Sequence, residues 1–191
     1  GESYIGSQTG AVLLESTQGA LNLIAPSLGK NSRLSTSSAD ITLRANRVIE
    51  SPNLMIRTSG DFVLEPYGFD FSNDVNVAFT QLEGQFDNFR IGKASVVSGQ
   101  SPRTVYLESG FTASGNIEIY GGLIDLFANK TQKSTNGDIT IKGQDLALNS
   151  SLEATSGDID LTGNVFSMGP SGATNTIKAE QGAVDLQTLT A

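Results

Sequence analysis

The chain has 191 residues with a net charge of −8, and it contains no Cys, His or Trp. The acidic charge argues against partners such as nucleic acid or anionic lipid, which bind to basic patches. The missing residue types exclude a disulfide framework, thiolate metal sites and a Ser-His-Asp triad, and no apolar run is long enough to cross a membrane as a helix.

A short motif recurs along the chain: a small residue, one variable residue, and then two apolar residues separated by one position. Its copies occupy residues 10–14, 19–23, 39–43, 60–64, 115–119, 137–141, 157–161 and 182–186. Steps of about 20 to 22 residues between most copies are typical of leucine-rich repeats or of β-solenoids. The leucine-rich consensus is absent, and apolar residues alternate with polar ones as they do in strands.

The spacing of the first two copies differs from the rest, because they start only nine residues apart. We expect them to be two strands of one turn. The step from the fourth copy to the fifth, 60 to 115, is 55 residues long and leaves room for two coils with additional loops.

The clearest coil runs from Asn136 to Gly157 and contains three alternating runs separated by turn residues. Since successive side chains of a strand point to opposite faces, the predicted inward residues are Ile139, Ile141, Leu146, Leu148, Leu152 and Ala154. Asp138, Thr140 and Lys142 are predicted to point outward. The third run recurs elsewhere in the same phase, as Leu54-x-Ile56, Phe111-x-Ala113 and Ile177-x-Ala179.

An Asp follows the corner Gly in several copies, as Asp61, Asp138 and Asp158. Asp at such a place bonds turn amides through its side chain, and this interpretation is favoured over a calcium ladder because the Gly-rich calcium repeat is absent. A second alternative is catalytic: Asp138 and Asp158 are expected to stack at a separation that suits glycoside hydrolysis, although no Arg or Lys is placed convincingly beside them and no long loop flanks them.

The region from about residue 66 to 112 departs from the repeat and holds most of the aromatic residues. One hypothesis is a ligand-binding surface, plausible for a glycan, made by Tyr67, Phe69 and Phe71, with oxygen ligands for calcium from Asp70, Asn73 and Asp74. The alternative, which we favour, is that wider coils bury these aromatic residues, because Phe69, Phe71, Val75, Val77 and Phe79 alternate.

The Gly-Asp-Ile repeats, together with the stretches Phe86–Lys93 and Gly115–Ile119, resemble the filamentous haemagglutinin-like exoproteins. These are large bacterial surface adhesins secreted by the two-partner, type Vb route. The resemblance implies a right-handed parallel β-helix, export through an outer-membrane transporter, and a stalk or adhesive role in virulence. Ser51-Pro-Asn-Leu54 departs from the motifs of the family's secretion domain, so an internal repeat segment is expected.

The sequence therefore predicts an all-β chain: a right-handed parallel β-helix (β-solenoid) with roughly 20–22 residues per coil and about eight to nine coils. Residues 1–191 are expected to form a single segment of a larger secreted, cell-surface protein. No catalytic residue, metal, cofactor or membrane insertion is predicted, and the expected partners are a host-cell or surface glycan or protein receptor, or other copies of the adhesin. The alternatives are a polysaccharide lyase or hydrolase and a glycan-binding module.

Overall fold

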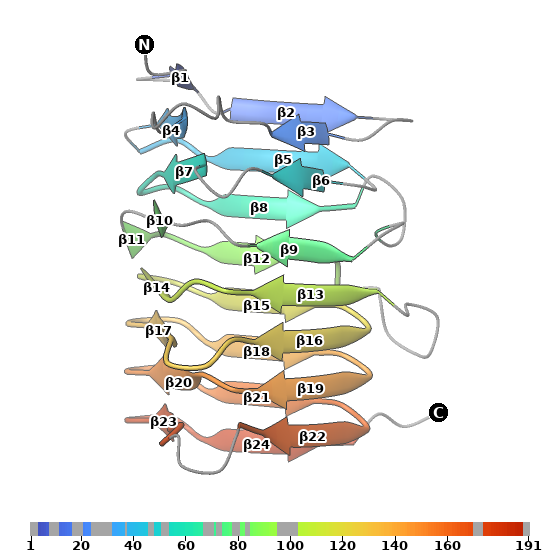
Figure 1. Cartoon of the computed structure of the whole chain (residues 1–191). Helices are drawn as coiled ribbons and strands as arrows, with labels where there is room; N and C mark the ends of the chain where they lie inside the picture. Colours follow the sequence, from blue (N-terminus) through green and yellow to red (C-terminus); the bar gives the residue numbers. More distant parts are fainter. Residues whose placement is uncertain are drawn as a thin grey trace.

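The computed structural model describes residues 4–7, 12–16, 21–23, 32–36, 38–45, 48–50, 54–66, 71, 74–77, 81–82, 85–94, 103–169 and 174–188. Within these ranges the chain forms strands and turns and no helix, so none of the described elements is a helix that could cross a membrane. The strands stack in parallel along one axis, from the amino end to the carboxyl end (Figure 1). The predicted all-β solenoid is confirmed, while its handedness and its number of coils stay predictions.

The longest sheet, called sheet 1 below, has eight parallel strands whose spatial order follows the chain. Its strands are β2 (Val12–Ser16), β5 (Ile41–Ala45), β8 (Phe62–Glu65), β12 (Phe89–Ile91), β15 (Ile117–Tyr120), β18 (Ile139–Lys142), β21 (Ile159–Thr162) and β24 (Val184–Gln187). Equivalent residues of successive coils lie directly opposite one another, as Ile117, Ile139 and Ile159 do. The predicted register of the repeat is thereby confirmed.

Two further sheets complete the coils from β9 onward. Sheet 2 consists of β9 (Val75–Val77), β13 (Thr104–Leu107), β16 (Leu123–Leu126), β19 (Asp145–Leu148) and β22 (Val165–Met168). Sheet 3 consists of β11 (Gln85–Phe86), β14 (Phe111–Ala113), β17 (Thr131–Ser134), β20 (Ser151–Ala154) and β23 (Ile177–Ala179).

Nearer the amino end, two smaller sheets are formed. One pairs β3 (Leu21–Leu23) with β6 (Val48–Glu50). The other contains β1 (Tyr4–Ser7), β4 (Ser32–Thr36), β7 (Leu54–Arg57) and β10 (Gln81–Leu82). The first two motif copies fall on β2 and β3, which pair with β5 and β6 respectively. The expectation that these copies are two strands of one turn is confirmed.

The core is a continuous apolar column inside the three sheets, and it confirms the predicted inward residues. In the coil from Asn136 to Gly157, all six predicted side chains are at most 1% exposed. Asp138 is exposed, and Thr140 and Lys142 are half-buried on the outer side. Side chains that point inward on successive coils fill the interior because parallel strands stack only about 4.8 Å apart.

One coil has a polar inner side on sheet 3, which the apolar pattern did not predict. Gln132 and Ser134 of β17 are fully buried, between Phe111 and Leu152 and between Ala113 and Ala154 respectively. Gln132 donates to the Ser109 carbonyl over 3.0 Å and accepts from the Ser150 hydroxyl over 2.7 Å. These bonds offset the cost of burying an amide.

The interpretation that wider coils bury the alternating run is confirmed for Phe71, Val75 and Val77, which are buried, whereas Phe69 and Phe79 lie outside the described residues. The side chains of Phe86, Phe89 and Phe111 are buried and pack against one another and against Phe62, with ring centroids 4.0 to 5.9 Å apart. Phe71 belongs to the same core. Large rings therefore fill the interior where the coils are longer.

Candidate functional site

A ladder of Asp and Asn side chains marks the corner at which each strand of sheet 1 begins. The Oδ1 atom of each ladder residue accepts a hydrogen bond from the backbone N–H of the equivalent residue one coil further on. The members are Asp40, Asp61, Asn88, Asn116, Asp138 and Asp158, with Ala183 as the last donor, at distances of 2.7 to 3.1 Å. The predicted turn chemistry of Asp61, Asp138 and Asp158 is confirmed, and it acts between coils.

The glycine immediately before the ladder residue Asp158 has no room for a Cβ atom. A Cβ built on Gly157 would lie 2.5 Å from the backbone carbonyl carbon of Gly137. Because the coils approach so closely at this point, only glycine fits without displacing backbone. The Gly-Asp pairs that define the sequence motif are therefore explained by packing between coils and by the ladder.

The outer side of sheet 1 carries an acidic stripe toward its carboxyl end, formed by Asp160 and Asp185, which lie opposite one another in register. Partial burial, and then the like charges of Asp158, Asp185 and Asp138, raise the pKa of Asp160 above its ordinary value. Among the described residues, no group of three or more acidic side chains is arranged to hold a metal ion. The stripe gives the surface a negative potential and carries no site by itself.

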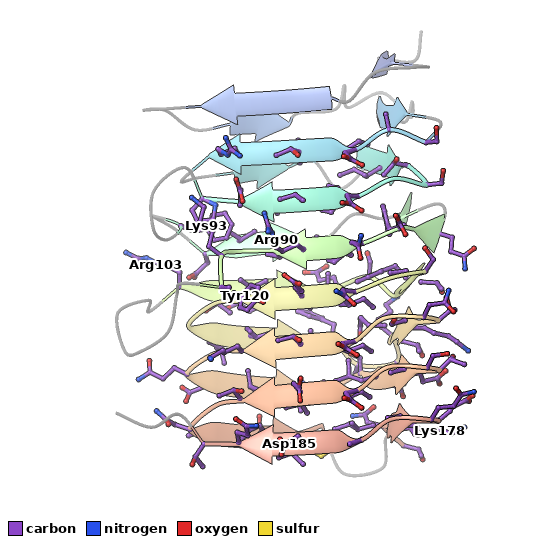
Figure 2. All side chains as sticks on the ribbon, turned by 180° about the vertical axis from the view of Figure 1, so that it is seen from behind. Arg90, Lys93, Arg103, Tyr120, Lys178 and Asp185 are labelled. Carbon is purple, nitrogen blue, oxygen red and sulfur yellow. The ribbon has the colours of Figure 1, made fainter. Side chains whose placement is uncertain are left out.

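A buried carboxylate forms the second notable feature of this surface. Glu65, at the end of β8, is 5% exposed. It accepts a hydrogen bond from Arg44 Nε over 2.6 Å and another from Arg90 over 2.8 Å. Figure 2 shows sheet 1 from its outer side, with Arg90 on one strand and Tyr120 on the next. A carboxylate between two guanidinium groups is well satisfied, so this Arg-Glu-Arg cluster fixes neighbouring coils to one another.

Tyr120 extends the same polar cluster. Its hydroxyl donates to the Glu118 carboxylate over 3.3 Å. Burial raises the pKa of the Tyr120 phenol, the Glu118 charge and hydrogen bond raise it further, and Arg90 acts in the opposite sense. Within the described residues, Arg90 Nε is the buried side-chain nitrogen that has no hydrogen-bond partner. The sequence did not indicate this cluster, because Arg44 is 21 residues from Glu65 and Arg90 is 25 residues from it.

The ligand-binding residues predicted from the sequence are only partly described. Tyr67, Phe69, Asp70 and Asn73 lie outside the described residues, so their proposed roles stay predictions. Phe71 is 4% exposed and lies in the core. Asp74 is exposed, and its carboxylate accepts a hydrogen bond from the Thr104 N–H over 2.9 Å.

An exposed aromatic pair occurs instead on the outer side of sheet 2, the side that Figure 1 presents to the reader. Phe127, just after β16, is 38% exposed, and Tyr106 on β13 is half-buried beside it. Their rings meet edge to face with centroids 6.3 Å apart. Asp125 lies opposite Tyr106 in register, and Asn149 Nδ2 donates to Asp125 Oδ1 over 3.1 Å. We call these four residues the sheet 2 patch.

The sequence gives only a weak signal for the sheet 2 patch. Tyr106 lies in the irregular region, but Phe127 lies beyond it, in a coil that follows the repeat. The run Leu123–Phe127 places Ile124 and Leu126 inward, so Phe127 falls on the outer phase and extends past the strand. An aromatic residue on the outer phase is the feature that could have indicated the patch.

Comparisons with known proteins return no match to a family model, to a curated protein or to a solved structure. The fold and the surfaces described above are therefore the basis for any statement about function.

Proposed function

We propose that this chain is an internal segment of a large secreted bacterial adhesin, in which it serves as a rigid stalk and as a surface for adhesion. The observation that carries the proposal is the continuous register of sheet 1 through eight parallel strands. In such a stack every coil contacts only its neighbours, so adding coils adds length without changing the cross-section. A protein that has to hold a binding surface away from a cell benefits from this geometry.

The proposed location is the bacterial cell surface, reached by two-partner secretion through an outer-membrane transporter. The resemblance of the Gly-Asp-Ile repeats to filamentous haemagglutinin-like exoproteins supports this route. The absence of Cys from the sequence is compatible with it, because the ladder and the apolar column stabilise the coils without disulfides. Host-cell or surface receptors, or other adhesin copies, are the proposed partners.

The test uses antibodies raised against residues 1–191 and intact bacteria that produce the parent protein. Labelling of intact cells, lost when the outer-membrane transporter is deleted, is the expected result. Antigen confined to the cytoplasmic fraction would contradict the proposal.

A separate experiment tests the geometry of the stalk by deleting residues 137–156, which form one full coil. The Gly-Asp-Ile stretch that follows then takes the place of the deleted one. The shortened segment should stay folded by circular dichroism and be shorter by X-ray scattering.

The alternative of a polysaccharide lyase or hydrolase is addressed by a separate experiment. Acidic polysaccharides are incubated with the segment, and reducing ends and unsaturated products are measured. Product formation that is lost in the double variant Asp138→Asn, Asp158→Asn would favour the enzyme. Both carboxylates already accept a backbone hydrogen bond from the next coil, which supports a structural role for them.

A further inference from the structure

Phe127 is unusual among the large apolar side chains that the structure describes as exposed. The other four, Val165, Met168, Val184 and Leu186, lie on β22 and β24, the last described strands of sheets 2 and 1. Phe127 lies in the middle of the stack, with a described coil on each side. Its exposure therefore does not arise from its being at an end of the stack, and the ring, together with that of Tyr106, offers solvent an apolar aromatic surface.

The backbone holds this ring in a defined place. The Phe127 N–H donates to the Leu107 carbonyl over 3.1 Å, and the Asn149 N–H donates to the Leu126 carbonyl over 3.0 Å. These two bonds extend the backbone pairing of sheet 2 by one residue, so Phe127 and Asn149 occupy equivalent positions on adjacent coils. The edge of one ring against the face of the other further restrains the pair formed with Tyr106.

A carboxylate and an amide lie beside the rings in a fixed relative orientation. Asn149 Nδ2 bonds to Asp125 Oδ1 over 3.1 Å, which orders both side chains. In the part of the chain that is described, the other carboxylate oxygen of Asp125 and the side-chain carbonyl oxygen of Asn149 accept no hydrogen bond from a side chain. Both groups are half-buried and therefore still reachable from solvent.

This combination suits a sugar ring. A pyranose has an apolar face of C–H groups, which packs on an aromatic ring, and an edge of hydroxyl groups. Asp and Asn together accept from and donate to adjacent hydroxyls, and a few fixed polar groups of this kind set the orientation of a bound ligand. The repeat of the sheet, about 4.8 Å per coil, provides a surface along which a chain of sugars can lie.

The charge of the surroundings selects among sugars. Asp125 lies in the patch, and Asp145 lies opposite Leu123 on the same sheet. The whole chain also has a net charge of −8. Uronates, sialic acids and sulfated sugars would be repelled, whereas neutral hexoses and N-acetylhexosamines would not.

We propose that the sheet 2 patch, formed by Tyr106, Phe127, Asp125 and Asn149, binds a neutral polysaccharide whose sugar ring stacks on the exposed aromatic pair. The proposal deepens the proposed adhesive function, on which it rests for its biological setting, by naming the class of ligand and its place on the stalk.

The experiment measures binding of chitohexaose, cellohexaose and a hexagalacturonate to the segment by calorimetry, with ring-proton signals followed by saturation-transfer NMR. At least one neutral hexasaccharide should bind and show saturation transfer to its C–H protons that decreases in Phe127→Ala, and the uronate should not bind. Phe127→Ala should weaken binding about tenfold, as the loss of one good aromatic contact does. Asp125→Asn, which keeps the size of the side chain, should weaken it less.

Thr140→Ala, on the outer side of sheet 1, is the matched control and should bind as the unmodified segment does, with circular dichroism confirming the fold of every variant. Failure of both neutral hexasaccharides to bind at millimolar concentration would overturn the proposal, as would binding unaffected by Phe127→Ala. Stronger binding of the uronate would overturn the choice of sugar class. None of these outcomes changes cell-surface labelling or the length of the rod, so failure here is distinguishable from failure of the proposed stalk function.

Discussion

The two coils between Phe62 and Ile117 and the two coils between Ile117 and Ile159 build the same sheet from different amounts of chain. From Ile117 to Ile139 and from Ile139 to Ile159, stacked residues of sheet 1 are 22 and 20 residues apart. From Phe62 to Phe89 and from Phe89 to Ile117 they are 27 and 28 apart. The extra residues lie mainly after the sheet 1 strand, since β12 ends at Ile91 and β13 begins at Thr104. Length varies most at this corner, whereas the corner before sheet 1 varies by only two residues: its stacked ends are three residues apart from Phe86 to Phe89, four from Ala113 to Ile117 and five from Ser134 to Ile139.

The ladder explains why the corner before sheet 1 varies so little. It passes through wide and regular coils alike, with Asn88 and Asn116 replacing Asp where the coils are wide. The interior differs more, because phenylalanine rings fill the wide coils and Ile and Leu fill the regular ones. Four sets of substitutions test how each region is stabilised.

The largest effect is expected from placing a charge in the regular coils. Ile139→Asp or Ile159→Asp buries an unpaired carboxylate in a fully enclosed position, which costs more than a domain of this size can tolerate. Loss of the strand signal in circular dichroism and of a cooperative melt is the expected outcome. Thr140→Gln, on the outer side of the same strand, serves as the control and should melt like the unmodified chain. An unchanged melt for Ile139→Asp would contradict the assigned inward direction.

A cavity in the wide coils should have the next largest effect. Phe89 contacts three other rings, so Phe89→Ala is expected to cost about 3–5 kcal/mol of unfolding free energy. Phe89→Leu keeps most of the volume and should cost less than half as much. Denaturant unfolding followed by circular dichroism measures both. Equal effects of the two substitutions would mean that ring packing does not stabilise the wide coils.

The ladder allows the two regions to be compared directly. Asp138→Ala removes one accepted hydrogen bond and should cost about 0.5–1.5 kcal/mol, whereas Asp138→Asn keeps the acceptor and should cost much less. Asn88→Ala should cost more than Asp138→Ala, because Asn88 also donates through Nδ2 to Asp61 over 2.8 Å. Unfolding free energies of the three variants provide the measurement. If Asp138→Asn costs as much as Asp138→Ala, the side-chain oxygen is not the stabilising group.

The smallest effect concerns the acidic stripe. A raised pKa means that ionised Asp160 destabilises the folded state above that pKa, and that this penalty disappears as the pH falls through it toward the ordinary value of 3.8. Asp160→Asn should therefore raise the melting temperature slightly at pH 7, with no such gain at a pH below 3.8. Thermal melts at the two pH values measure the difference. A gain of the same size at both would assign the effect to something other than charge.

Much of the fold could be predicted because alternation and turn residues are local properties. The alternation within each strand correctly predicts the inward direction of Ile139, Ile141, Leu146 and Leu148. Gln132 could not be predicted, since the run Thr131–Ser134 contains no apolar residue, and its inward position follows only from stacking under Phe111. The same reason applies to the Arg-Glu-Arg cluster around Glu65.

The candidate site was harder to predict from the sequence than the fold was. Aromatic content directed attention to Tyr67 and Phe69, which lie outside the described residues. The exposed pair of Tyr106 and Phe127 is separated by one coil and is brought together by the register of sheet 2. Surface composition is set by which residues stack side by side, and a single sequence does not contain that information until the register is known.

The ladder also has a direction, and this has a consequence for how the chain is assembled. Each side-chain oxygen accepts from the coil that follows it in the sequence, as Asp138 accepts from Asp158 and Asp158 from Ala183. A coil that is already folded thus presents an ordered acceptor to the first amide of the coil that emerges next. Folding that proceeds from the amino end is templated at every step, which is the order in which a chain leaves a ribosome or a pore amino end first.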